Sequence, residues 1–145
     1  MERSETHLKV RLSDVDAFGV VWHGRYISYF EAGRTDLLQP FGLSAARLKE
    51  EGFFPAIVSF QCDLLSPARD EESLVVRCWP EPSEAARLTL CYEIVREDDG
   101  ELVVRGTTTQ VLIDSRGVLL YRFPPAVKER VEALLSALDG GGDSG

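Results

Sequence analysis

The second half of the sequence alternates between apolar and polar residues in four successive stretches separated by short turns. They are Ala56 to Leu65, Leu74 to Trp79, Arg87 to Arg96 and Glu101 to Ile113. Such alternation is typical of strands that bury one face, and Asp-Gly at positions 99–100 is a strong hairpin signal. Because short connections join antiparallel neighbours, the pattern predicts an antiparallel sheet.

Alternation also predicts which side chains share a face in two of the strands. An earlier strand, from His7 to Leu12, is expected to place Leu8, Val10 and Leu12 on one face. In the strand from Ala56, strict alternation predicts that Val58 and Phe60 share a face.

Two or three helices are expected beside this sheet. From Gly24 to about Leu38, residues recur at helical spacing as one stripe, which consists of Tyr26, Tyr29, Phe30, Gly33 and Leu37. Glycine in mid-helix costs about 0.5–1 kcal/mol relative to alanine, which indicates that Gly33 allows close approach to another surface. Ser44 is the expected N-cap of a short helix, and Pro124-Pro125 opens a final one. One long helix against a broad antiparallel sheet is an α+β architecture.

Length and composition limit the class of protein. The 145 residues favour one domain, expected over residues 1–138, with a flexible Gly-rich tail over 139–145. A net charge of −8 argues against nucleic-acid binding, and no apolar run approaches the roughly 20 residues of a membrane span. The three cysteines form no C-x-x-C pair and are expected as reduced thiols of a cytoplasmic protein.

The loop between the first strand and the long helix, residues 13–26, has an unusual composition. It sets two carboxylates, one histidine and two glycines beside the apolar run Val20-Val21-Trp22. A loop of this kind is either a packing device or the rim of a pocket. Residue types alone slightly favour packing.

This loop also carries a resemblance. Asp14-x-Asp16-Ala-x-Gly19-Val-Val-x-His23-Gly-x-Tyr26, followed by Phe30-Glu31-Ala-x-Arg34-Thr35, resembles the 4-hydroxybenzoyl-CoA thioesterase-like branch of the hotdog-fold superfamily. It is similar above all to the acyl-CoA thioesterases encoded beside the Tol–Pal envelope system. The resemblance implies a hotdog fold, an antiparallel sheet wrapped around the long helix. It also implies homodimers or dimers of dimers, with active sites between subunits, that hydrolyse acyl-CoA without a metal or other cofactor.

The resemblance further implies roles for residues of the loop. Asp16 aligns with the catalytic carboxylate, as general base or nucleophile. The backbone amides of His23 and Gly24, at the start of the helix, are implied to polarise the thioester carbonyl. The His23 imidazole is equally compatible with assisting there and with a structural role.

Two other acidic residues have simpler explanations. Asp14 is expected to accept backbone N–H groups in an Asx-turn. Glu31 is expected to pair with Arg34 at i,i+3, and it remains the reserve candidate for a catalytic acid.

Substrate contacts are expected at two places. The acyl group, aryl or aliphatic, is expected near Tyr26, Tyr29, Val58 and Phe60. Since coenzyme A is anionic, it needs local positive charge, for which Arg69 and Arg87 are the candidates, followed by Arg105 and Arg116. Two other functions stay open: a hydratase or dehydratase of acyl-thioesters, and a non-catalytic module that binds them.

Overall fold

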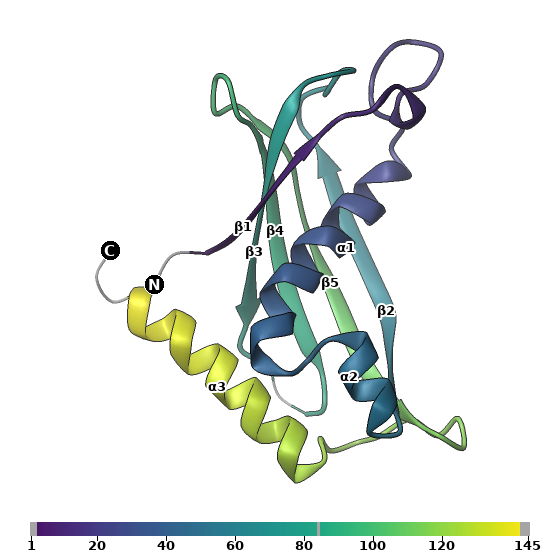
Figure 1. The fold of residues 1–145 in the computed structure, drawn as a ribbon, viewed down its shortest axis with the longest axis vertical. Helices are drawn as coiled ribbons and strands as arrows, with labels where there is room; N and C mark the ends of the chain where they lie inside the picture. The colour runs from purple at the N-terminus through teal and green to yellow at the C-terminus, as the bar shows by residue number, and fades with distance from the viewer. Residues whose placement is uncertain (1–2, 84, 143–145) are drawn as a thin grey trace.

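One antiparallel sheet with a long helix across one face forms the protein in a computed structural model (Figure 1). The structure describes residues 3–83 and 85–142, with side chains up to residue 137. The strands are β1 (Ser4–Lys9), β2 (Phe53–Leu64), β3 (Ser73–Glu81), β4 (Leu88–Arg96) and β5 (Leu102–Asp114). They lie in the order β1-β3-β4-β5-β2, and every neighbouring pair is antiparallel. The sheet and the long helix confirm the predicted α+β hotdog architecture.

Three α-helices and two short 3-10 helices complete the described part of the chain. The α-helices are α1 (Arg25–Leu38), α2 (Ala45–Glu50) and α3 (Pro125–Gly142), and the 3-10 helices are η1 (Leu12–Asp14) and η2 (Gln39–Phe41). Ser44 caps α2 as predicted, since its Oγ accepts the Arg47 N–H at 3.1 Å. In residues 3–83 and 85–142, no helix has the length and hydrophobicity needed to cross a membrane.

The end of α3 overlaps the expected tail. The helix continues to Gly142, so its backbone includes residues 139–142, where the sequence suggests a flexible tail. The rest of that segment, residues 143–145, lies outside the described residues.

The long helix α1 packs on the sheet through a small residue. Gly33 is buried, and a Cβ at this position would lie 2.8 Å from Val76 Cγ1 on β3. One turn earlier, Phe30 is fully buried and stacks on Tyr92 of β4, with ring centroids 4.2 Å apart. The close approach predicted from Gly33 is therefore confirmed.

A β-bulge in β2 changes which side chains share a face. Ile57 pairs with Gln110 and Ser59 pairs with Thr109, so Val58 is an extra residue without a partner in the register. An inserted residue reverses the alternation that follows it. Ile57, rather than Val58, consequently shares a face with Phe60. The predicted placement of Val58 beside Phe60 is wrong, because an alternating pattern carries no sign of a bulge.

The first strand lies three residues earlier in the sequence than expected. It ends at Lys9, and Leu12 lies in η1 with 73% of its surface exposed. The predicted common face of Leu8, Val10 and Leu12 is therefore correct only for Leu8 and Val10, which pack in or against the core.

Candidate active site

The loop between β1 and α1 is an ordered hairpin. The Asp16 N–H donates to the Val20 carbonyl and the Trp22 N–H donates to the Asp14 carbonyl, each at 2.9 Å. The turn is closed by Gly19, whose φ of +80° is in the left-handed region that favours glycine. Asp14 and Asp16 are thus held at defined places before α1.

The carboxylate of Asp16 is partly engaged by its own turn. It is half-buried, and its Oδ1 accepts the Phe18 N–H at 2.8 Å. This is the Asx-turn hydrogen bond that was predicted for Asp14. Within the part of the chain that the structure describes, the other oxygen, Oδ2, has no hydrogen-bond partner.

The carboxylate of Asp14 instead ties the loop to the helix. Its Oδ2 accepts the Tyr29 hydroxyl at 2.9 Å and the Arg11 N–H at 3.1 Å. Its Oδ1 lies 3.6 Å from the Arg25 Nε. Burial, and then the hydrogen bond to Asp14, raise the pKa of Tyr29 well above its ordinary value. The sequence did not suggest this link, because Tyr29 was assigned to the helix's apolar stripe.

The helix α1 begins directly after this hairpin. Gly24 is its N-cap, and no described residue accepts a hydrogen bond from the N–H groups of His23 or Gly24. These donors stand at the positive end of the helix dipole, an arrangement that suits an oxyanion. A Cβ on Gly24 would overlap the Trp22 indole. The His23 ring is exposed, with its centroid 5.1 Å from that of Trp22.

The connection between β2 and β3 supports the hairpin from its other side. The Val21 N–H donates to the Ala68 carbonyl at 2.8 Å, and Val20 forms an isolated bridge with Arg69. Ala68 is completely buried, whereas Arg69 is exposed. The connection therefore brings Arg69 next to the loop that carries Asp16.

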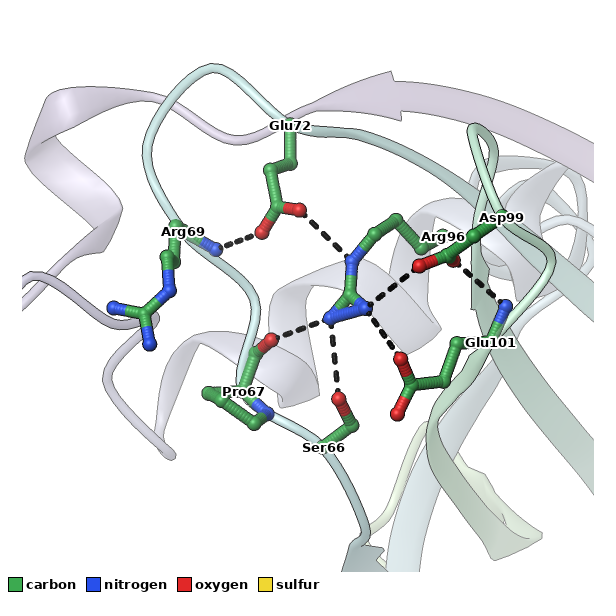
Figure 2. Close-up of polar contacts among 7 residues, drawn as sticks. All are labelled: Ser66, Pro67, Arg69, Glu72, Arg96, Asp99 and Glu101. Carbon is green, nitrogen blue, oxygen red and sulfur yellow. Dashed lines mark hydrogen bonds and ion pairs between the residues drawn. The ribbon is translucent and has the colours of Figure 1, made fainter.

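The same connection is held by Arg96 at the end of β4 (Figure 2). The Arg96 guanidinium donates to Ser66 Oγ at 3.1 Å and to the Pro67 carbonyl at 2.7 Å. Its Nε lies 2.8 Å from a Glu72 carboxylate oxygen, and its Nη1 lies 3.0 Å from one of Glu101. Figure 2 also shows the Arg69 guanidinium directed away from this cluster. Arg96 thus joins the β2–β3 connection to the β4–β5 turn.

The arginines expected at coenzyme A do not form one patch in a single chain. Arg69 precedes β3 and Arg87 follows it, so the nine residues of the strand, about 30 Å in length, separate them. Arg105 and Arg116 each lie close to an aspartate, at 3.6 and 3.3 Å. Of these four, only Arg69 lies beside the Asp16 loop.

A cavity of about 460 Å³ lies between α1, α2, β2 and β5. Its apolar wall includes Ile27, Leu38, Leu43, Pro55, Ile57 and Phe60. Of the residues expected at the acyl group, Phe60 lines this cavity, Val58 does not, and Tyr26 and Tyr29 are buried in the core. Asp16, His23 and Gly24 do not line it either.

Polar groups also face this cavity, among them Glu31 and Arg34. Glu31 is exposed and Arg34 is half-buried. Their predicted i,i+3 ion pair is wrong, since no carboxylate of a described residue lies within 4.0 Å of the Arg34 guanidinium. Arg34 Nη1 instead lies 3.4 Å from the Tyr92 hydroxyl, which shares a 2.7 Å hydrogen bond with Thr108.

Known proteins are similar to this chain in sequence and in fold. The putative acyl-CoA thioesterase YneP of Bacillus subtilis is 25% identical over 126 residues, which are 87% of this chain and 91% of that protein. A putative esterase of Synechocystis is 30% identical over 128 residues, 88% of this chain and 77% of that protein. The DHNA-CoA thioesterase structure from Staphylococcus aureus has a TM-score of 0.86 and 27% identity, with 98% of this chain and 96% of that chain covered.

The family assignment follows from a match that spans most of the sequence. The model of the thioesterase-like superfamily matches residues 10–131. This range contains the β1–α1 hairpin, the long helix and all the named strands except β1. The chain therefore belongs to the thioesterase-like superfamily.

Proposed function

We propose that this protein is an acyl-CoA thioesterase, which hydrolyses a coenzyme A thioester to a free acid and coenzyme A. The observation that carries the proposal is the hairpin before α1. It combines a carboxylate oxygen of Asp16 that lacks a described partner with two unpaired N–H groups at the helix N-terminus. Membership of the thioesterase-like superfamily supports a thioester as the substrate.

Hydrolysis of a thioester needs few protein groups. A thiolate is a good leaving group, because the pKa of its conjugate acid is about 8.5. Asp16 takes a proton from water as the water oxygen attacks the acyl carbon, or attacks that carbon itself. The N–H groups of His23 and Gly24 stabilise the negative charge on the carbonyl oxygen. The carbon–sulfur bond then breaks. If Asp16 acted as the base, the thiolate or bulk water takes up its proton. If Asp16 attacked directly, water hydrolyses the resulting mixed anhydride, which releases the acid and regenerates the carboxylate.

The proposal includes a second copy of the chain. β2 is an edge strand of 12 residues, and its side chains Phe54, Ile57, Val58 and Leu64 are 40–57% exposed. A long apolar edge favours association with another strand. Two chains joined along β2 give a homodimer with its active sites between subunits.

Arg69 is the proposed contact for the coenzyme A phosphates, because it is exposed and lies beside the Asp16 loop.

The proposed compartment is the cytoplasm. In support, the three cysteines Cys62, Cys78 and Cys91 are all free, as is usual in a reducing environment.

Thiol release from a panel of aryl and aliphatic acyl-CoAs, followed with a thiol-reactive dye, tests the proposal. We expect catalytic release with at least one member of the panel. Tight binding of acyl-CoA without thiol release supports the non-catalytic module instead. Addition of water to crotonyl-CoA without thiol release supports a hydratase. Either of these results overturns the proposed hydrolysis.

A further inference from the structure

The cavity between α1 and the sheet contains a positive charge that no described residue compensates. Arg34 is half-buried, and the one hydrogen-bond partner of its side chain among the described residues is the Tyr92 hydroxyl, at 3.4 Å. That is a long hydrogen bond, and the Tyr92 hydroxyl also binds Thr108 at 2.7 Å. A partly buried charge is costly unless it is paired. The cavity is therefore suited to an anion next to Arg34.

A second polar group faces the same cavity without a partner. Gln110 is only 6% exposed and lines the cavity. Its side-chain amide makes no hydrogen bond to any described residue. Buried amides are nearly always hydrogen-bonded, and the amide N–H₂ can donate to the same anion as a guanidinium. Arg34, with one long hydrogen bond, and Gln110, with none to a described residue, thus both offer donors to a ligand in the cavity.

Most of the remaining wall is apolar, and its other polar residues are Glu31, Thr35, Ser44 and Thr108. Ile27, Ile57 and Phe60 are among the wall residues, and the volume of about 460 Å³ is within the usual range for small-molecule sites. Glu31 is exposed, whereas Arg34 is half-buried and Gln110 is buried. The negative charge of Glu31 thus lies at the solvent side of the cavity, and the positive charge of Arg34 lies further inside.

The cavity follows the face of α1 that starts at the proposed oxyanion site. Gly24, Ile27, Glu31 and Arg34 are spaced by three or four residues and so share one helix face. From Gly24 to Arg34 the helix rises about 15 Å, and the Arg34 side chain tilts back toward the N-terminus. An extended acyl chain whose carbonyl binds the Gly24 N–H can pass Ile27 and reach the guanidinium.

We propose that Arg34 and Gln110 bind a carboxylate at the far end of the acyl group, so that the preferred substrate is the coenzyme A thioester of a dicarboxylic acid of medium length. The inference rests on the proposed thioesterase function. The guanidinium binds the carboxylate through charge-assisted hydrogen bonds, and the apolar wall packs on the methylene groups. Glu31 disfavours short diacids, because their terminal carboxylate would lie near the Glu31 carboxylate and be repelled by it.

Matched pairs of substrates test this inference. Octanoyl-CoA is compared with suberoyl-CoA, and decanoyl-CoA with sebacoyl-CoA, by kcat/KM for thiol release and by calorimetric Kd with Asp16→Asn. We expect the terminal carboxylate to favour the second member of each pair on the order of 10- to 100-fold. Arg34→Gln removes this preference, whereas Arg77→Gln retains it, because Arg77 pairs with Glu5 and does not line the cavity.

The outcomes separate the inference from the proposed function. Hydrolysis of both members at equal rates, or a preference that survives Arg34→Gln, overturns the inference and leaves the thioesterase intact. If neither these substrates nor any other acyl-CoA of the panel is hydrolysed, the proposed function fails, and calorimetry on the wild-type chain decides the inference by the same preference. If Arg34→Gln does not fold, Gln110→Leu serves in its place, and an unchanged preference in that variant contradicts the inference.

Discussion

The Tyr29 hydroxyl donates a 2.9 Å hydrogen bond to Asp14 Oδ2 and so joins the second turn of α1 to the hairpin that carries Asp16. Asp14 is two residues before Asp16, and it is not itself placed in the chemistry. The bond fixes where the hairpin meets the helix N-terminus. The proposed alignment of Asp16 with the His23 and Gly24 amides would therefore depend on a residue that lies inside the core.

Removal of this bond tests its contribution. We expect Tyr29→Phe to lower the free energy of unfolding by about 1–2 kcal/mol, because a hydrogen bond to a carboxylate is lost while the ring stays packed. Denaturant unfolding followed by fluorescence measures the change. Tyr121→Phe is the matched control, since Tyr121 is 81% exposed. Equal midpoints for both variants contradict the role of Tyr29.

The contact between α1 and β3 gives a second prediction. Gly33→Ala introduces a methyl group that would lie 2.8 Å from Val76 Cγ1. Overpacking of this kind costs about 1–3 kcal/mol, more than the gain in helix propensity. We expect Gly33→Ala combined with Val76→Ala to lose less stability than the sum of the two single variants. Strict additivity in this double-mutant cycle contradicts the close contact.

Arg96 gives a third prediction. We expect Arg96→Met to lower the free energy of unfolding by about 2 kcal/mol or more, because Glu72 and Glu101 then face each other without the cation between them. Thermal and denaturant unfolding measure the loss. Arg105→Met is the control, since its ion pair with Asp63 is exposed on both sides and surface pairs contribute little. A similarly small loss in both variants contradicts a stabilising role for the Arg96 contacts shown in Figure 2.

Acid stability depends on the contact between α3 and the end of α2. Arg130 donates two 2.6 Å hydrogen bonds to the Glu51 carboxylate, and these bonds lower the pKa of Glu51. A carboxylate with a lowered pKa stabilises the folded state above its unfolded pKa of about 4.3, and this contribution is lost as the pH falls through the folded value.

Melting temperatures measured from pH 7 to pH 3 check this effect. We expect the wild-type protein to be more stable than Glu51→Gln at pH 7 and to lose that advantage below about pH 4. A constant difference between the two proteins across this range contradicts the linkage. Glu50→Gln is the neighbouring control, because Glu50 has no described ion pair.

Much of the fold was predictable because it depends on local patterns. The periodicity of residues 88–113 located β4, β5 and their hairpin, and Ser44 marked the start of α2. The bulge at Val58 was not predictable, since it arises from the pairing of β2 with β5. The Arg96 cluster was missed for a similar reason, because its partners come from residues 66–72 and 99–101.

The site was predictable only in part. The motif located the hairpin and the helix start, but the Asx-turn forms at Asp16 and not at Asp14. The link from Asp14 to Tyr29 and the lone charge of Arg34 depend on three-dimensional packing. Spacing along a helix allowed a Glu31–Arg34 pair, but Arg34 is oriented to the Tyr92 hydroxyl instead.

The most direct test of the proposed mechanism is the kcat of Asp16→Asn for thiol release from the best acyl-CoA. Asparagine retains the acceptor for the Phe18 N–H, so the hairpin should keep its shape while the carboxylate is lost. Glu31→Gln, in the cavity, and Asp98→Asn, in the β4–β5 turn, are measured alongside. The account predicts that kcat falls on the order of 10²- to 10⁴-fold in Asp16→Asn and stays near the wild-type value in Asp98→Asn. A folded Asp16→Asn protein with nearly full activity, or a comparable loss confined to Glu31→Gln, would contradict it.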